Sequence, residues 1–334
     1  GHASTGFGTR WPAQDFDGPL QYQGRGLSAL GCLPRVARLN QTDKARGLIA
    51  RLERGLRRPG RPSLAVPRFG AFGSTMEVVR QSVYDYPKYY DVLFGSDWKA
   101  EYDFLCDCFE YYAKRPVRRV FEPACGTGRL LFRFAQAGYE VAGLDLNEKA
   151  VEYCNRRFQR LGLSAHVWVG DMADFRVKRK YDAAFNTINS FRHLTDDKSA
   201  MGHLACMREA LAKGGLYILG FHLTPNRPPK CTEESWVVRR GHLQVNSWMK
   251  TLSLDRQRRE EKVYLQFDVY TPRRSFRIVN EFVFRTYTWQ QFHRLLQRVG
   301  GWEIAGTHDF AYRIDEPITV DDYTEDVVYV LRRV

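Results

Sequence analysis

The 334-residue sequence lacks three features that would place it in a class at once. No apolar run approaches the roughly 20 residues that a membrane-spanning helix needs, so we expect no membrane segment. The first residues lack the charged and then apolar stretch of a secretory signal, and a cytoplasmic protein is expected. The seven cysteines are odd in number, and the C-x-C of Cys106 and Cys108 has no matching Cys or His pair. This favours reduced thiols and no metal.

Positive charge is abundant, with 51 Lys and Arg against 38 Asp and Glu, but its location in the sequence weakens the hypothesis that the protein binds nucleic acid. Residues 1–75 hold 12 of the basic residues, only 4 of the acidic ones and 12 of the 27 glycines. We expect this segment to be a mobile leader or a cloning-derived addition without chemistry, with one helix at 42–58. Met76, where the composition changes, is the expected natural start, and an Arg-rich transit peptide is the alternative.

From residue 84 onward, strands and helices alternate. The expected strands cover residues 117–122, 141–146, 165–169, 181–186 and 215–221. The expected helices cover residues 100–112, 129–137, 148–161 and 198–211. Strands that alternate with helices in this way form a parallel sheet with helices on both faces.

The pattern changes after Pro225. Four strands without intervening helices are expected at 236–240, 243–254, 261–270 and 276–287, followed by a helix at 289–299 and strands at 302–308 and 326–332. We therefore predict an α/β fold. A Rossmann-like, doubly wound, seven-stranded and mostly parallel sheet occupies residues 76–222 and 287–334. An antiparallel β insertion after the fifth strand, at 223–286, roofs the active site with an inner wall of phenylalanines at 267, 276, 282 and 284.

The stretch RRVFEPACGTGRLL, residues 118–131, leads from a strand through a glycine-rich turn into a helix. Gly126 and Gly128 fit the first two positions of a dinucleotide fingerprint, but Leu131 stands at the third. No Gly-Lys-Ser/Thr of a phosphate-binding loop follows. Glu122 would repel a phosphate, whereas it suits a ligand with an ammonium group. S-adenosylmethionine has an ammonium group and a ribose and carries no phosphate.

Residues at the next two strand ends fit the same ligand. Asp145 ends the second strand in GLDLN, where an acidic side chain can accept hydrogen bonds from both ribose hydroxyls. Asn147 is placed to cap the helix that follows. In GDMADF, Asp171 is placed to accept from the adenine amino group while the Met172 amide donates to the ring.

The motifs EPACGTG, GLDLN, GDMADF and YDAAFN stand in the order and spacing found in class I S-adenosylmethionine-dependent methyltransferases, which residues 84–333 resemble. The resemblance implies S-adenosylmethionine as cofactor, S-adenosylhomocysteine as product and no metal. It also implies cofactor contacts by ten residues: Glu122, Ala124, Gly126, Gly128, Asp145, Leu146, Asp171, Met172, Asn186 and Tyr90.

The closer resemblance is to small-molecule N-methyltransferases that dimethylate aminosugars and to the glycine N-methyltransferase group. In the aminosugar enzymes, a His-Leu after the fourth strand resembles His193-Leu194, and a tyrosine joins that histidine near the substrate nitrogen. Tyr84 is the candidate for this tyrosine, with Tyr89 or Tyr90 as alternatives. His193 is then the expected proton acceptor, since an imidazole with a pKa of roughly 6.5 suits the task.

Asn189 and Arg192 are the expected substrate contacts, and a solvated Arg192 is the alternative. The predicted function is in-line methyl transfer to a small-molecule acceptor, with an amine nitrogen preferred. O-methylation, RNA methylation and non-catalytic cofactor binding remain alternatives. A nucleic-acid substrate is disfavoured because residues 186–189 read Asn-Thr-Ile-Asn, without the prolines of base-amine methyltransferases. A homodimer through the outer face of the insertion is left open.

Overall fold

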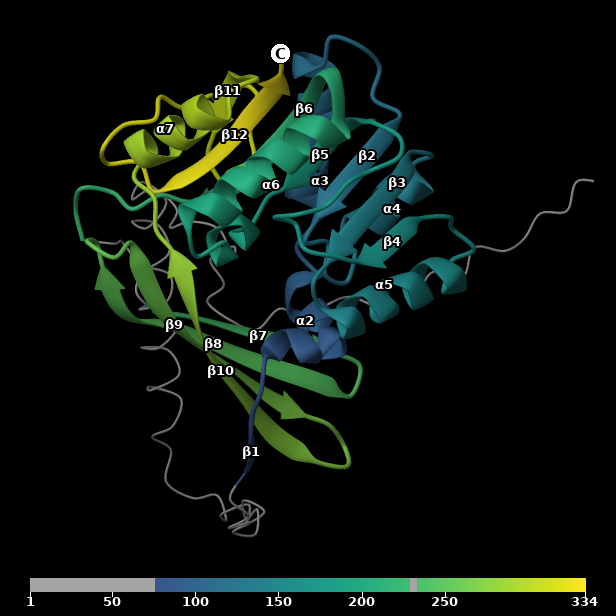
Figure 1. The fold of residues 1–334 in the computed structure, drawn as a ribbon. Helices are drawn as coiled ribbons and strands as arrows, with labels where there is room; N and C mark the ends of the chain where they lie inside the picture. The colour runs from purple at the N-terminus through teal and green to yellow at the C-terminus, as the bar shows by residue number, and fades with distance from the viewer. Residues whose placement is uncertain (1–75, 229–232) are drawn as a thin grey trace, which may run out of the picture.

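The computed structural model describes residues 76–228 and 233–334, so the leader and its expected helix lie outside the described residues. Its main sheet has seven strands in the order β11-β12-β6-β5-β2-β3-β4 (Figure 1). The strands are β2 (Arg119–Pro123), β3 (Glu140–Asp145), β4 (His166–Val169), β5 (Tyr181–Asn186), β6 (Leu211–His222), β11 (Trp302–His308) and β12 (Asp326–Arg333). All neighbouring strands pair in parallel except β12, which is antiparallel to both β6 and β11. The predicted fold class is confirmed.

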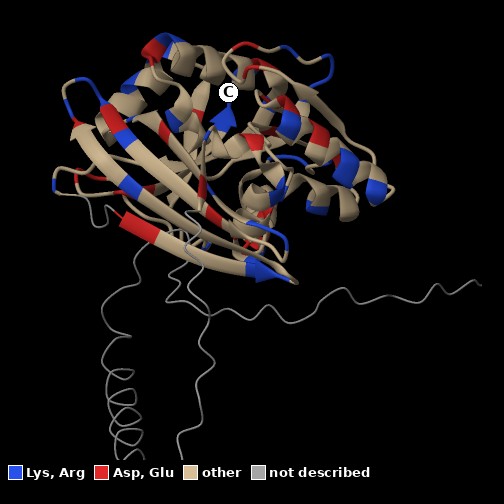
Figure 2. Cartoon of the chain, turned by 90° about the horizontal axis from the view of Figure 1, so that it is seen from below, with Lys and Arg blue, Asp and Glu red and all other residues tan. Residues whose placement is uncertain are grey.

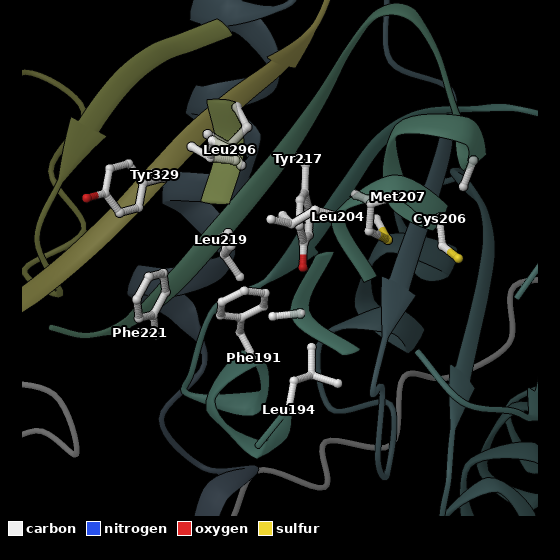
Figure 3. Packing of buried hydrophobic residues seen from close by; sticks show 14 of the residues in the cluster. Phe191, Leu194, Leu204, Cys206, Met207, Tyr217, Leu219, Phe221, Leu296 and Tyr329 are labelled. Carbon is white, nitrogen blue, oxygen red and sulfur yellow. The ribbon is translucent and has the colours of Figure 1, made fainter. Parts of the chain in front are cut away.

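Helices cover both faces of the main sheet. One core packs α3 (Lys99–Tyr112), α4 (Leu131–Gln136) and α5 (Glu148–Arg160) against it, and the other packs α6 (Asp197–Ala210) and α7 (Trp289–Val299). Figure 3 shows the second core, in which Phe191, Leu204, Tyr217, Phe221 and Leu296 converge from helices, strands and a loop. Within the described ranges, no helix is both long and apolar enough to cross a bilayer.

A second sheet of five strands, β1-β10-β9-β8-β7, lies at the end of the main sheet where β6 leads into it (Figure 1). Its strands are β1 (Glu77–Arg80), β7 (Glu233–Arg240), β8 (Leu243–Asp255), β9 (Glu260–Tyr270) and β10 (Ser275–Arg285). The four inserted strands are antiparallel, as expected. β1 was not expected from the sequence; it pairs in parallel with β10 from Glu77↔Phe276 to Arg80↔Val279. A four-residue strand is too short to show a clear alternation of apolar and polar residues. Its partner strand lies about 200 residues away in the chain, so no neighbouring segment indicates the pairing either.

The tyrosine-rich segment, residues 83–94, folds against the inner face of the second sheet. It comprises a short 3-10 helix, η2 (Val83–Asp85), and α2 (Pro87–Phe94), which begins with proline at its first position, where no amide hydrogen is needed. Val83 and Val92 are buried in a cluster with Phe267 and Phe276 of the second sheet. Two of the four phenylalanines expected to wall the active site therefore serve as the core beneath α2.

Candidate functional site

The glycine-rich turn after β2 is held in left-handed backbone conformations. Ala124, Gly126 and Gly128 have φ angles of 52°, 52° and 66°. A Cβ added at Gly128 would lie 2.5 Å from Cys154 Sγ, so this glycine is required for packing on α5. A Cβ added at Gly126 would meet nothing closer than Asp145 Oδ2 at 4.0 Å. The surface of the turn at Gly126 is thus open for a ligand.

Asp145 lies beside this turn at the end of β3. Its Oδ2 accepts from the Gly126 amide and its Oδ1 from the Asn147 amide, both at 2.8 Å. Burial raises the pKa of Asp145, and these two amides oppose the rise. Asn147 caps α5 as predicted, its side chain accepting from the Ala150 amide at 3.0 Å. Leu146, the next residue, is 75% exposed and offers an apolar surface beside the carboxylate.

Two buried acceptor atoms near the turn have no hydrogen-bond partner among the described residues. They are Glu122 Oε2 on β2 and Asn186 Oδ1 on β5. Asn186 is oriented by its own amide, which donates to the Pro123 carbonyl at 2.8 Å. Burial raises the pKa of Glu122 well above its usual range, and Arg129 opposes this. Such atoms are costly to bury without a partner, so the pair fits a ligand that donates hydrogen bonds and carries positive charge.

The loop after β4 presents the backbone of Met172. His203 Nδ1 lies 2.9 Å from the Met172 carbonyl, which can only accept, so Nδ1 carries the proton. The other ring nitrogen, Nε2, then accepts from the Tyr217 hydroxyl at 2.7 Å. Asp171 is exposed, and its Oδ1 accepts from the Ala173 amide at 2.8 Å. The buried histidine therefore fixes the loop that is expected to meet the adenine.

Tyr84 and His193, far apart in the sequence, meet in the structure. The Tyr84 hydroxyl lies 3.0 Å from His193 Nε2, and the ring of His193 packs on Phe282 and Phe284 at centroid distances of 5.4 and 4.8 Å. The ring of Tyr90 lies 5.5 Å from that of Tyr84. Five residues that were singled out from the sequence thus form one aromatic cluster, in which Tyr84 and His193 are hydrogen-bonded to each other.

Burial controls the protonation of this pair. It lowers the pKa of His193 to about 4, with Arg192 adding to the effect. It raises the pKa of Tyr84 well above its usual range and that of Tyr90 to about 12. The expectation of an ordinary imidazole pKa is therefore wrong, and His193 is uncharged at neutral pH. Its role as proton acceptor stays a prediction that this low pKa disfavours.

The loop that carries His193 is anchored by Phe191, whose fully buried side chain lies in the core of Figure 3. The loop forms the 3-10 helix η3 (Ser190–His193), and Asn189 before it adopts a left-handed φ of 56°. Arg192 is 4% exposed, forms an ion pair with Glu261 and places its guanidinium 4.5 Å from the centre of the Phe284 ring. The alternative hypothesis of a solvated Arg192 is therefore wrong, because its side chain is buried and its charge is paired with Glu261.

A cleft opens between the second sheet and the ends of β6 and β12. Its lining includes Asn189, Arg192 and Phe284, which were expected from the sequence, and His222 and Asp326, which were not. His222 is the last residue of the fifth strand in sequence order of the main sheet, a position where doubly wound folds bind ligands, and this signal could have revealed it. In the described part of the chain, no three His, Cys, Asp or Glu side chains gather to hold a metal.

Asp91 of α2 fastens the tyrosine-rich segment to its surroundings. The side chain is 2% exposed and accepts from the Thr127 hydroxyl of the glycine-rich turn at 3.1 Å. It also accepts from the Tyr153 hydroxyl at 3.2 Å and pairs with Arg157 at 2.5 Å, both on α5. Arg240 at the end of β7 lies 3.5 Å away. One buried carboxylate therefore joins the turn, α5 and the second sheet.

Parts of the chain are similar to known methyltransferases. Residues 120–215 match the family model described as a methyltransferase domain. The chain is 27% identical over 157 residues to a dTDP-3-amino-3,4,6-trideoxy-alpha-D-glucopyranose N,N-dimethyltransferase of Streptomyces venezuelae, covering 46% of this chain and 62% of the relative. It is 30% identical over 132 residues to a glycine/sarcosine N-methyltransferase of Halorhodospira halochloris, covering 37% of this chain and 47% of the relative.

The crystal structure of an S-adenosylmethionine-dependent methyltransferase from Clostridium acetobutylicum has a similar fold. The TM-score is 0.62 at 19% identity, with 75% of this chain and 99% of that chain covered. The matched regions span only about three fifths and about half of the two curated relatives. The chain thus carries a methyltransferase domain, and its fold is that of the class I S-adenosylmethionine-dependent methyltransferases.

Proposed function

We propose that this protein transfers a methyl group from S-adenosylmethionine to an amine nitrogen of a small molecule. The observation that carries the proposal is the set of unpaired buried acceptors, Glu122 Oε2 and Asn186 Oδ1, beside an open glycine turn. They suit the ammonium group of the donor. Asp145 is placed to accept from the ribose hydroxyls, since each carboxylate oxygen accepts more than one hydrogen bond. Exposed Leu146 suits one face of the adenine ring.

The cleft between the two sheets is the proposed acceptor site. Ligands of doubly wound folds bind beyond the carboxyl ends of the strands, and the cleft lies beyond the end of β6. The second sheet roofs the cleft with Met249, Val263 and Phe284. A roof of this kind excludes water and strengthens polar contacts to the acceptor.

Positioning is the main catalytic task that the residues perform. When bound, the donor supplies a sulfonium methyl group, which the acceptor nitrogen takes by in-line displacement. Tyr84 and His193 form one polar pair in their aromatic surroundings, and His193 packs on Phe284 of the cleft, so we assign the pair a part in orienting the acceptor nitrogen. Neither group changes charge near neutral pH, because the pKa of His193 is lowered to about 4 and that of Tyr84 is raised.

The surface of the protein favours a small acceptor over a nucleic acid. In Figure 2, segments with Lys or Arg alternate with segments with Asp or Glu over the helices and the second sheet, and no continuous basic tract crosses the face shown. Binding of a single strand combines a basic groove with stacking residues. The aromatic residues around His193 instead pack on one another, and the side chains of Tyr84 and His193 are only partly exposed.

The test is a matched acceptor panel in which release of S-adenosylhomocysteine and product mass are measured. The panel pairs amines with their hydroxyl analogues, glycine with glycolate and aminosugars with the parent sugars, and adds an RNA pool and a sample without acceptor. We expect methylated product with amines and not with the matched hydroxyl compounds. Product only from hydroxyl compounds or RNA would refute the amine assignment. Tight S-adenosylhomocysteine binding without turnover of any acceptor would indicate a binding protein.

A further inference from the structure

His222 and Asp326 form a histidine–carboxylate pair at the junction of the two sheets. They are register partners at the end of β6 and the start of β12, and His222 Nδ1 lies 2.8 Å from Asp326 Oδ1. The carboxylate accepts, so Nδ1 donates. The His222 backbone amide donates to Asn189 Oδ1 at 3.0 Å, and the ring packs edge-on against Phe310 at 5.1 Å. The ring is therefore held in place, while Nε2 has no hydrogen-bond partner among the described residues.

The pair lines the proposed acceptor cleft together with Asn189, Arg192 and Phe284. Phe284 also packs on His193, which does not itself line the cleft. His193 is poorly suited to hold a proton. Its Nε2 already meets the Tyr84 hydroxyl, and a pKa of about 4 makes protonation at pH 7 unfavourable by about a thousandfold. The His222 side chain is 30% exposed and has one nitrogen available.

The charged groups around His222 favour a cation. Asp326 and Glu325 approach from β12 and the loop before it, Glu234 from β7 and Glu261 from β9, and all four line the cleft with His222. Four cations also line the cleft: Arg192 is paired with Glu261, Lys250 lies 3.9 Å from Glu233, Arg256 donates to the Pro225 and Arg227 carbonyls, and Arg227 is the fourth. Burial raises the pKa of Glu234, the carboxylates at 325 and 326 add to this, and His222 opposes it. These carboxylates suit an acceptor that arrives as an ammonium ion.

We propose that His222 is the proton acceptor of the reaction and that Asp326 is its positioning residue, an inference that rests on the proposed amine methyltransferase function. One proton moves from the acceptor ammonium to His222 Nε2, and the electron pair stays on nitrogen. The imidazolium keeps its hydrogen bond to Asp326 and later releases the proton to solvent. The free electron pair then forms the bond to the transferred methyl group, while the donor sulfur retains the electrons of the bond that breaks.

The test uses the amine that the acceptor panel shows to be methylated best, with rates measured from about pH 6 to 10. The variants are His222→Gln and Asp326→Asn, and the control is His166→Gln, an exposed histidine on β4. We expect His222→Gln to lower kcat about 10²-fold near pH 7, a typical effect of losing a general base. The deficit shrinks as pH approaches the pKa of the amine itself, because a free amine needs no base. Asp326→Asn shows a smaller deficit of the same pH dependence.

Two outcomes would overturn the proposal. Wild-type kcat in His222→Gln near pH 7 would exclude a base role, and a deficit that is equal at every pH would indicate a structural one. Unchanged binding of S-adenosylhomocysteine in each variant shows that the fold is intact. If His222→Gln does not fold, the pH dependence of kcat in Asp326→Asn provides the test. A wild-type protein that methylates no amine defeats the proposed function and this inference together. An active amine methyltransferase that is indifferent to position 222 defeats the inference alone.

Discussion

Replacing Asp145 by alanine is the sharpest test of the donor site. We expect S-adenosylhomocysteine to bind the wild-type protein with micromolar affinity, on the order of −8 kcal/mol. The variant loses the carboxylate proposed to accept from the ribose hydroxyls. A hydrogen bond to a charged group contributes roughly 1.5–3 kcal/mol, so the dissociation constant should rise about 10- to 100-fold. Isothermal titration calorimetry measures this change directly.

The substitution also removes two intramolecular hydrogen bonds, so stability needs its own control. Asp182 offers a matched one, because its Oδ2 accepts from the backbone amides of Arg118 and Arg119 at 3.0 and 2.9 Å, as Asp145 accepts from Gly126 and Asn147. It lies at the opposite end of the parallel strands, where β5 begins. Asp182→Ala should lower the melting temperature and leave the affinity intact. Unchanged affinity in a folded Asp145→Ala protein would refute the ribose assignment.

Three further predictions follow from other parts of the structure. A protein that begins at Met76 should keep its melting temperature and turnover, whereas one that begins at Ser82 should melt earlier because β1 is lost; equal melting would show that β1 contributes nothing. Burial raises the folded-state pKa of Glu122, so the unliganded protein loses stability as pH rises above about 4.3, the unfolded value. Glu122→Gln should therefore melt above the wild type at about pH 8 and lose this advantage toward about pH 4 in thermal scans, and a difference independent of pH would contradict the argument. Tyr84→Phe and His193→Gln should lower kcat non-additively, because they remove one shared hydrogen bond, and additive losses in the double variant would deny that coupling.

The residues of the proposed cofactor site could be predicted from the sequence because each belongs to a short local motif at the end of a strand. Asp145 ends β3, and Gly126, Asn147 and Met172 each follow a strand within three residues. Parallel strands bring their carboxyl ends to one edge. The cap by Asn147 follows from the residue type alone. The pairing of Tyr84 with His193 came from resemblance and not from any pattern within this chain.

The contacts around the proposed acceptor cleft could not be predicted from the sequence, because they join segments that are far apart in the chain. The ion pair of Arg192 with Glu261 joins η3 to β9, and nothing near either residue in the sequence signals it. The pKa of His193 depends on burial beneath β10, which a loop position does not reveal. His222 stood at a strand end where ligands bind, but its partner Asp326 begins a strand that is 104 positions later.

The carboxylate of Asp91 has a consequence for the timing of ligand exchange. Moving α2 away from the glycine-rich turn would leave Arg157, which is 8% exposed, without its partner. Breaking a buried ion pair costs about 3–5 kcal/mol, so at any instant only about one molecule in 10² to 10⁴ has this helix displaced. At any instant nearly every molecule therefore has the tyrosine-rich segment in place. A ligand that exchanges without waiting for this displacement has the far side, between the second sheet and the ends of β6 and β12, where the cleft is already open.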